Sequence, residues 1–481
     1  MADFIVAIEL GSSKITGIAG KKNLDGSIKV LAVVKEDATS CIRKGVVNNI
    51  DKTVQALSNV IKKLENILKT KIARVYVGVN GQSIRSEKNI IVKQLPADTK
   101  VTVDMVNGLM DANRSMQYPD QEILDAVTQE YKVDNQLQVD PTGFICTRLE
   151  GNFLNILWRK SFYRNLNRCF ENAGIAIAEM YLSPLALADA VLTDAERRGG
   201  CVLVDLGAET TTVAVYYRDI LRHLAVIPLG SNNITKDLTS LQMEDKTAEE
   251  MKLKYAAAYT DSSEIDMGKT YPIDHDRSID MPKFVEIVEA RVQEIIENAW
   301  HQVPDEYVGK LLGGIVLTGG GSNMKEIGKA FKILTHTDKV RIAGSVTTTI
   351  ISKSPAITAK DGTMCTVLGL LAKGNMNCAG SEISDSLFQN EQPANNASAQ
   401  PILTHSTTEN GKGIIKTEAE KAAEEAAKRK QEEEEERRRQ QEAEEEEERR
   451  RKKRENSWFH KAVNGLKSFG RKMVEEEEDE K

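Results

Sequence analysis

The sequence predicts an α/β fold in which one nucleotide-binding half is duplicated, and three glycine-containing stretches carry that prediction. Residues 200–217 indicate a buried strand, an acidic corner, a glycine turn and a returning strand. Residues 5–11 repeat the beginning of this pattern 196 positions earlier. Residues 313–324 run from a short apolar strand into a triple glycine. Because uninterrupted apolar strands are typical of sheets covered on both faces, helices are expected around each half.

The two hairpins combine a carboxylate with a glycine in the same order. Asp205 ends one strand, and Gly207 allows the backbone to approach a ligand closely. When the two stretches are aligned with the 196-position offset, Glu9 corresponds to Asp205 and Gly11 corresponds to Gly207. We therefore expect two turns that face each other across a cleft. The alternative is two unrelated buried strands that each end in glycine.

The triple glycine is the third part of the pattern. It precedes a predicted helix from Lys325, whose N-terminal amides suit a phosphate or nucleotide. In this order and spacing, the three stretches resemble the actin, sugar kinase and heat-shock chaperone superfamily. That resemblance implies that the two hairpins clasp phosphates and that the glycine loop packs on the adenosine.

Composition narrows the class of protein. The 481 residues allow about three domains. A net charge of -7 gives no reason to expect nucleic acid as a partner. The six cysteines are scattered without a Cys-x-x-Cys pair, which disfavours a zinc site and a disulfide framework and fits a reducing cytosol. Neither a signal peptide nor an apolar span of about 18 residues is expected.

Periodicity and capping residues place the remaining elements of the core. In the first half we predict helices at residues 53–68, 161–174 and 184–192, the last capped by Ser183, and a strand at 72–79. Residues 102–115 predict a helix among short strands. In the second half, strands are expected within 220–229, mostly helix over 231–306, and a last helix at 363–371.

One pair of charged residues in the helical region has two interpretations. Thr247 and Glu250 have the spacing of a capping box, which places Glu249 and Lys252 on one exposed helix face. A surface ion pair is the simpler interpretation. The position between the second hairpin and the triple glycine favours the adenosine-contacting helix of the superfamily.

The composition changes after the last predicted helix. Residues 375–416 are rich in Asn, Ser, Gln, Gly and Thr, which predicts a flexible linker. Residues 417–455 contain no Leu, Ile, Val or aromatic residue, so a coiled coil is disfavoured. A solvated single helix and a charged disordered tether both remain open for this stretch.

Residues 456–474 predict an amphipathic helix with basic residues opposite its apolar side. This pattern is typical of a helix that lies in the plane of an anionic membrane surface, and a groove on a partner protein is the competing interpretation. The acidic tail, residues 475–481, makes the affinity of a single copy modest, so self-association would be needed. The membrane residues on the apolar side are Trp458, Phe459, Val463, Leu466, Phe469 and Met473.

The cleft, the insertion and the tethered helix together resemble the bacterial cell division protein FtsA family. Residues 130–134, 140–143 and 148–150 look like that family's insertion-domain signature, and residues 165–184 are similar to its return segment. The resemblance covers residues 1–375 and the terminal helix. It implies an actin-like fold with a small inserted α+β domain, followed by a charged tether and an amphipathic helix.

The expected domain organisation follows from the resemblance and from composition. Residues 1–82 and 161–198 form the first half, 83–160 the inserted interaction domain, 199–230 and 310–374 the second half, and 231–309 a smaller helical subdomain. Residues 375–455 form the tether, 456–474 the membrane-targeting helix and 475–481 the acidic tail.

The resemblance also implies the ligand set, which is ATP with Mg²⁺. Water-mediated magnesium contacts would come from Glu9 and Asp205. No catalytic residue is assigned. The residues implied in nucleotide binding are Gly11, Ser12, Ser13, Lys14, Gly207, Thr210, Thr211, Glu249, Lys252, Gly319, Gly320, Gly321 and Ser322.

Two departures from the family pattern bear on catalysis. The first hairpin has Glu9 in place of the usual Asp, and the second has Ala208 and Glu209 in place of glycines. Since phosphoryl transfer depends on positioning and charge neutralisation, we expect ATP to be bound but hydrolysed slowly at most.

The function implied is that of a peripheral adaptor on the cytoplasmic face of the inner membrane at the division site. It would tether the FtsZ ring, recruit other division proteins through the inserted domain, and assemble into filaments. Docking of the FtsZ tail is expected within residues 231–309. A related pilus-assembly adaptor and a small-molecule kinase of the same fold are the alternatives, and a chaperone is the least favoured.

Overall fold

The computed structural model describes residues 3–380, 411–431, 433 and 437–439. The chain divides into two compact units, Met1–Thr417 and Glu418–Lys481. In the second unit, residues 418–431 are helical, which agrees with the helical alternative for that part of the tether. The predicted helix at 456–474, with its six membrane residues, lies outside the described residues. None of the described helices is both long enough and apolar enough to cross a membrane.

The first sheet of the larger unit has seven strands in the order β19-β3-β2-β1-β6-β11-β20. Helix α1 (Ile50–Leu68) packs on β2 and β3, and α12 (Cys365–Lys373) packs on β1 and β2. Gly17 of β2 lies against α1 and Gly20 lies against α12, so the two helices cover opposite faces. The strands are β1 (Ile5–Leu10), β2 (Lys14–Lys22), β3 (Ile28–Asp37), β6 (Val75–Val79), β11 (Ile177–Leu182), β19 (Ile350–Ile351) and β20 (Ile414–Ile415).

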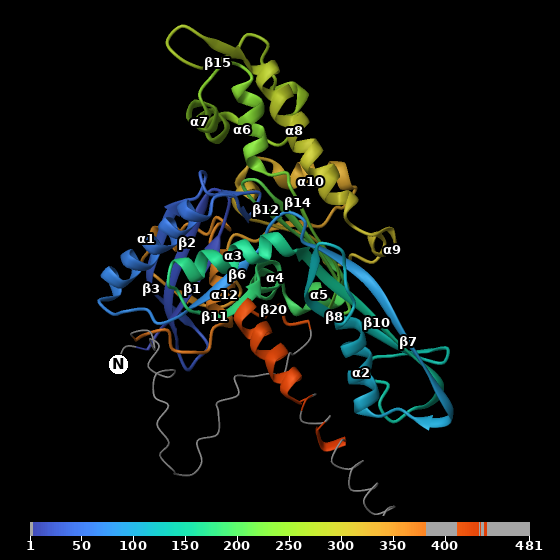
Figure 1. The fold of residues 1–481 in the computed structure, drawn as a ribbon. Helices are drawn as coiled ribbons and strands as arrows, with labels where there is room; N and C mark the ends of the chain where they lie inside the picture. Colours follow the sequence, from blue (N-terminus) through green and yellow to red (C-terminus); the bar gives the residue numbers. More distant parts are fainter. Residues whose placement is uncertain (1–2, 381–410, 432, 434–436, 440–481) are drawn as a thin grey trace, which may run out of the picture. The chain divides into compact units, whose positions relative to one another are not determined.

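The second sheet has nine strands in the order β18-β17-β12-β13-β14-β7-β10-β8-β9. The last four belong to the insertion, which therefore extends the sheet of the second half through β14 (Figure 1). The strands are β7 (Arg85–Lys100), β8 (Gln121–Val133), β9 (Gln136–Gln138), β10 (Ile145–Arg159), β12 (Cys201–Leu206), β13 (Thr211–Tyr217), β14 (Ile220–Ile227), β17 (Gly314–Thr318) and β18 (Val340–Ile342).

The duplicated hairpin is confirmed at the level of residue pairing. Glu9 opposes Thr16 in the β1–β2 hairpin, and Asp205 opposes Thr212 in the β12–β13 hairpin. The bounds of β1 and β12 also differ by the 196 positions that relate the two sequences. Parallel strands β6 and β17 then flank β1 and β12 respectively. The predicted actin-like α/β fold, duplicated around two sheets, is therefore confirmed.

The insertion is an α+β domain with a core of its own. Helix α2 (Val103–Arg114) packs on β7 and β10. Leu109 and Met110 of this helix are buried with Tyr131 and Phe153, which lie on the strands. At the junction with the second half, Nη2 of Arg222 donates to Glu130 at 3.2 Å.

The region between the second hairpin and the triple glycine contains α6 (Ser231–Thr239), α7 (Asp245–Tyr255), α8 (Met281–His301) and α9 (Asp305–Val308). It also contains the hairpin of β15 (Thr270–Pro272) and β16 (Ser278–Asp280), which the prediction of mostly helix missed. Tyr271 of β15 stacks on Tyr255 with ring centroids 4.3 Å apart, so aromatic packing holds this short hairpin on α7.

Two predicted helix caps differ from the structure. Helix α7 begins at Asp245 after Glu244, so Thr247 lies inside the helix and the predicted capping box is wrong. Helix α4 (Ser183–Val191) is capped at Leu182, so Ser183 is its first residue and not its cap. The remaining elements are β4 (Ile42–Arg43), β5 (Val46–Val47), α3 (Lys160–Asn172), α5 (Asp194–Gly199), η1 (Ser262–Glu264), η2 (Gly320–Asn323), α10 (Ile327–Thr335) and α11 (Pro355–Thr358).

The predicted flexible linker at 375–416 is wrong at both ends. Cys378 is fully buried, and its backbone N–H donates to Phe4 at 2.8 Å. Strand β20 joins the first sheet by pairing with β11. Composition does not reveal these contacts, because each depends on backbone hydrogen bonds to strands that are distant in the sequence.

Candidate functional site

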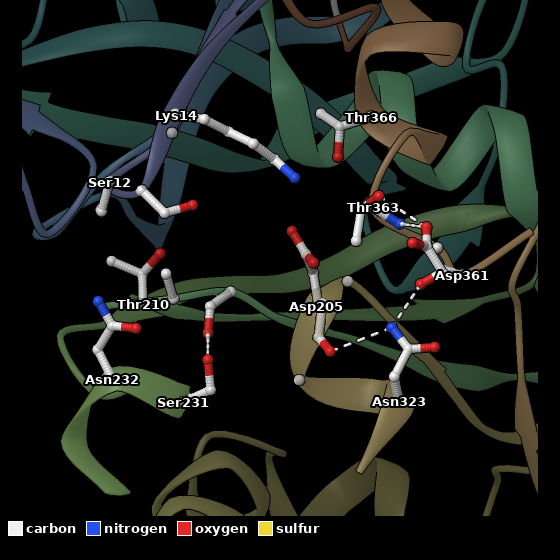
Figure 2. Close-up of a pocket in the computed structure, with 18 of the residues that line it drawn as sticks. Ser12, Lys14, Asp205, Thr210, Ser231, Asn232, Asn323, Asp361, Thr363 and Thr366 are labelled. Carbon is white, nitrogen blue, oxygen red and sulfur yellow. Dashed lines mark hydrogen bonds between the residues drawn. The ribbon is translucent and has the colours of Figure 1, made fainter. Parts of the chain in front are cut away.

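A cavity of about 620 Å³ lies between the two hairpins, the triple glycine and α7. Figure 2 shows Lys14 pointing into it from the first hairpin. Thr210, Ser231 and Asn232 line one side, and Asp361 lies on another with Thr363 and Asn323 (Figure 2). The cavity therefore joins segments from both halves of the chain.

Both hairpin turns have the same backbone geometry. The N–H of Gly11 donates to the carbonyl of Lys14 at 3.0 Å, and the N–H of Gly207 donates to that of Thr210 at 2.9 Å. A Cβ added to Gly207 would lie 2.8 Å from the Thr210 carbonyl oxygen, which is too close for any other residue. Glycine therefore sets the tight turns that border the cavity.

Two carboxylates stand at the base of the cavity. Burial raises the pKa of Glu9 from 4.5 to about 8, with a further contribution from the charge of Asp205 and an opposing one from Lys14. Burial also raises the pKa of Asp205 from 3.8 to about 6. Both acids line the same cavity, and the charge of Asp205 disfavours the ionised form of Glu9, so a bound cation would favour ionisation of this pair.

The triple glycine packs directly on the second carboxylate. Gly319 has φ +83°, and a Cβ added there would lie 2.3 Å from Oδ1 of Asp205. A short 3₁₀ turn follows, and the expected helix begins only at Ile327, so its N-terminus is displaced from the glycines. The loop can approach a ligand closely because these positions carry no side chain.

The pair Glu249 and Lys252 lines the cavity from α7, but Lys252 is not on an exposed face as expected. Its side chain is 6% exposed, and Nζ lies 2.6 Å from Oε2 of Glu249. The same ammonium donates to Oγ1 of Thr235 at 2.9 Å and to the Ser231 carbonyl at 3.2 Å. The pair therefore fixes α7 against α6 beside the cavity.

The structure brings most of the implied site residues to this cavity. Thr211 and Ser322 are the exceptions: both are buried, and their hydroxyls donate to the carbonyls of Leu229 and Gly319. They shape the hairpin and the loop from behind and do not line the cavity. The implied residues that line it are Glu9, Gly11, Ser12, Ser13, Lys14, Asp205, Gly207, Thr210, Glu249, Lys252, Gly319, Gly320 and Gly321.

A turn near the last helix also lines the cavity, and the sequence analysis missed it. Asp361 accepts from the N–H of Thr363 at 3.0 Å, and Gly362 has φ +75°. Asn323 donates to the Asp361 carbonyl at 2.7 Å and so links this turn to the triple glycine. The Asp-Gly dipeptide was a usable turn signal, but nothing in it indicated the distant glycine loop as its partner.

The helix after the second hairpin supplies a further wall. The backbone N–H groups of Ser231 and Asn232 donate to the carbonyls of Gly207 and Ala208, at 3.0 and 2.7 Å. A Cβ on Gly230 would lie 2.6 Å from the Ala208 carbonyl oxygen, so glycine permits this close approach. The N-terminus of α6 is thereby seated on the hairpin turn.

The extra acid of the second hairpin does not add charge to the cavity. Oε2 of Glu209 accepts from the backbone N–H of Lys44 at 2.7 Å, and Oε1 lies 3.6 Å from Nζ of Lys236. Lys44 precedes Gly45, which lines the cavity and donates its N–H to Oγ of Ser12 at 2.8 Å. Glu209 therefore ties the second hairpin to a loop of the first half.

The donor set of the site suits a hard cation that retains water. Among the residues that the structure describes, there is no cluster of three or more His, Cys, Asp or Glu side chains that could enclose a metal ion. Magnesium commonly takes one or two carboxylates and keeps several waters, which is what Glu9 and Asp205 could offer. Asp361 and Lys14 add one charge of each sign to the lining.

Two acidic hairpins that face a glycine loop across one cavity define an actin-like protein with a nucleotide-type cleft. Comparison with known proteins then places the chain more closely. The chain belongs to the family of the cell division protein FtsA. The family model described as cell division protein FtsA matches residues 202–369, and the model described as the SHS2 domain inserted in FtsA matches residues 81–157.

Curated relatives support the same assignment. The chain is 31% identical over 339 residues to cell division protein FtsA of Porphyromonas gingivalis, covering 69% of this chain and 71% of the relative. It is 34% identical over 331 residues to FtsA of Neisseria meningitidis, covering 67% and 80%. A solved PilM–PilN type IV pilus biogenesis complex aligns with a TM-score of 0.53 at 14% identity, covering 76% and 97%, which shows a shared fold alone.

Proposed function

We propose that this chain is an actin-like, ATP-binding cell division protein that links the FtsZ ring to the cytoplasmic face of the inner membrane. ATP with Mg²⁺ would occupy the cavity. The hairpin residues, with Ser12, Lys14 and Thr210, would meet the phosphates. Glu9 and Asp205 would hold the water shell of the ion, and Glu249 with Lys252 would border the adenosine.

The observation that supports this proposal is the pair of opposed carboxylates at the base of a cavity between duplicated glycine turns. Without a cation, burial raises the pKa of both groups, and the charge of Asp205 raises the pKa of Glu9 further. Bound magnesium would neutralise them and the phosphates together. Lys14, which lowers the pKa of Glu9, would contribute a positive charge in the same cavity.

The adaptor role rests on the family and on the sequence of the tail. The amphipathic helix at 456–474 would lie on the anionic membrane, the inserted domain would recruit other division proteins, and residues 231–309 would receive the FtsZ tail. Self-association into filaments would multiply the modest affinity of one helix for the membrane. ATP would act chiefly as a structural ligand that closes the cleft, with slow hydrolysis at most.

Nucleotide binding tests the cleft. We expect a fluorescent ATP analogue to bind the full chain in a Mg²⁺-dependent manner, and Glu9→Gln or Asp205→Asn to weaken this by tenfold or more. Glu250→Gln is the matched control, because that carboxylate lies on α7 but is 68% exposed and does not line the cavity. Equal affinity of all four proteins would contradict the proposed site.

Liposome co-sedimentation tests the adaptor. Pelleting with anionic vesicles is expected to rise with ATP and to be lost when the chain ends at Glu455 or carries Trp458→Glu/Phe469→Glu. His460→Glu/Ser468→Glu adds the same charges to the polar side of the predicted helix and should retain most of the binding. If all variants pellet equally, the membrane role is wrong, and binding of residues 456–474 to a groove on a partner protein comes forward.

A further inference from the structure

A short segment near the end of the larger unit, residues 411–416, is docked on both the first half and the inserted domain, and we call it the strap. Its strand β20 pairs with the edge strand β11, with Ile415 opposite Met180 and Ile414 opposite Tyr181. The N–H of Leu182 donates to the carbonyl of Gly413 at 2.8 Å. The strap therefore adds one strand to the first sheet.

The same segment is bound by a buried carboxylate of the insertion. Asp125, on β8, accepts from the N–H of Gly411 at 3.1 Å with Oδ1 and from the N–H of Gly413 at 2.8 Å with Oδ2. Asp125 is 4% exposed, so its charge cannot be solvated by bulk water. Backbone donors meet both oxygens and compensate this burial: the N–H of Ala126 in the insertion also donates to Oδ1, at 2.7 Å, and the strap supplies the other two.

Backbone conformation and the space available in the groove restrict which residues the strap can carry. Gly411 and Gly413 have φ +78° and +75°, and a Cβ on Gly413 would lie 3.0 Å from Cδ2 of Leu185. Ile415 is 2% exposed, whereas its neighbour Ile414 is 37% exposed. The groove therefore accepts a segment in which two left-handed glycines precede a two-residue strand, and Ile415 of that strand faces the protein.

The far end of the strap is held by the first half. The hydroxyl of Tyr163, on α3, donates to the carbonyl of Lys416 at 2.6 Å. The segment thus crosses from the insertion at Asp125, over β11 and α4, to α3. The two ends of this six-residue strap are therefore fixed by different parts of the larger unit.

We propose that this groove is a peptide-binding site that recognises a Gly-x-Gly-x-Ile segment and that the chain's own strap occupies it. Docking of the strap holds the inserted domain on the first half. When the strap leaves, Asp125 becomes a partly unpaired acid and the insertion loses a contact to the first half.

The small size of the contact makes the strap removable. Its ladder with β11 is only two residue pairs long, and Ile415 is its one large buried side chain. Addition of a strand to a sheet edge is a common way to bind an extended peptide. Because the strap belongs to the same chain, its effective concentration at the groove is on the order of millimolar, which favours the docked state.

The test compares two neighbouring isoleucines in the full chain. Ile415→Asp should release the strap, and Ile414→Asp is the matched control because its side chain faces outward. Hydrogen exchange at Leu182 and along β8 is expected to accelerate tenfold or more in Ile415→Asp and to stay unchanged in Ile414→Asp. Unchanged exchange in both variants would overturn the proposal.

Peptide binding gives a second and independent readout. A fluorescent peptide with the sequence of residues 409–417 should bind Ile415→Asp, whose groove is open, and not the wild-type chain. Adding Asp125→Asn should reduce that binding at least tenfold. If the peptide fails to bind an Ile415→Asp chain that retains its thermal unfolding transition, the groove is not a peptide site.

A further variant covers the case in which Ile415→Asp does not fold. Gly413→Ala should release the strap through its contact with Leu185, and Gly26→Ala has a similar φ of +81° with no atom within 4 Å of the added Cβ. Faster exchange at Leu182 in Gly413→Ala alone supports the proposal. Protection that rises with protein concentration would instead place the strap of a second copy in the groove, contrary to the proposal.

Discussion

Single positions decide how closely the parts of the cleft approach each other. Gly319 lets the glycine loop lie against the carboxylate of Asp205, and Gly207 closes the hairpin that presents this acid. The pKa values of Glu9 and Asp205 are raised because the acids are partly buried in the same cavity. At this scale, glycines allow close backbone packing in the cleft, and this packing surrounds two carboxylates whose ionisation is unfavourable.

Gly319→Ala should destabilise the chain strongly. The added Cβ would meet Oδ1 of Asp205 at 2.3 Å, and φ +83° is strained for alanine. We expect a loss of about 3 kcal/mol in the free energy of unfolding. Gly26→Ala, with φ +81° and open space around it, should lose only about 1 kcal/mol. Chemical denaturation measures both, and equal losses would show that packing on Asp205 does not matter.

The raised pKa values of Glu9 and Asp205 predict that the free energy of unfolding of the cation-free protein depends on pH. The pKa of Glu9 is about 8 in the folded chain and 4.5 ordinarily, so the folded chain keeps a proton that the unfolded chain releases. The free energy of unfolding should therefore fall by a few kcal/mol between about pH 4.5 and 8. Asp205 acts in the same direction up to about pH 6.

Denaturation at several pH values tests this dependence. The difference in the free energy of unfolding between the wild type and Glu9→Gln should change in favour of the variant as the pH rises to 8. Mg²⁺ with ATP should reduce the effect, since a bound cation stabilises the ionised acids. A pH-independent difference would mean that Glu9 is ionised without cost.

At the scale of elements, the ammonium of Lys252 positions α7, although the sequence analysis predicted this side chain on an exposed helix face. Lys252 connects α7 to α6 through Thr235 and the Ser231 carbonyl, while Ser231 in turn contacts the hairpin turn at Gly207. A chain of hydrogen bonds thus runs from the helix that borders the cavity to the turn that would meet phosphate.

Lys252→Met should loosen α7 and weaken nucleotide binding. Removal of the ammonium leaves the Glu249 carboxylate with Thr235 alone, and we expect a loss of about 2 kcal/mol in the free energy of unfolding. Lys246→Met, on the same helix but 85% exposed, should change it by less than about 0.5 kcal/mol. Thermal unfolding and ATP-analogue titration of both variants distinguish the two positions.

At the scale of the whole larger unit, the two halves are joined by side-chain hydrogen bonds near the cavity as well as by the chain. Glu209 of the second hairpin accepts from the N–H of Lys44 in the first half. Asn80 of the first half donates to Oγ1 of Thr212 at 3.3 Å. Such contacts favour the closed arrangement of the cleft, and they should slow the release of a bound nucleotide.

Glu209→Ala should therefore accelerate nucleotide dissociation. Loss of one charge-assisted hydrogen bond of about 1.5 kcal/mol predicts a rate increase of roughly tenfold. Glu209→Gln keeps an acceptor for the Lys44 N–H but removes its charge, so nucleotide should dissociate at a rate between those of the wild type and Glu209→Ala. Stopped-flow displacement of a fluorescent ATP analogue gives both rates, and identical rates for all three proteins would exclude a closing role for Glu209.

Sequence alone determined the features that depend on neighbours along the chain. The β1–β2 and β12–β13 hairpins, their acidic residues and their glycine turns follow from apolar runs and local backbone demands, and the 196-residue offset revealed the duplication. The glycine loop followed from the same patterns, and the family resemblance that they carry implied part of the cavity lining. These signals are readable because residue type and local conformation are directly coupled.

Only the tertiary structure decided which distant groups meet. It joined the turn at Asp361 to the glycine loop, turned Glu209 away from the cavity and buried Lys252 between two helices. It also docked the strap on Asp125 and β11, within a stretch whose composition predicts a flexible linker. These contacts depend on groups that are far apart in the chain, and local periodicity in the sequence does not indicate which distant groups will meet.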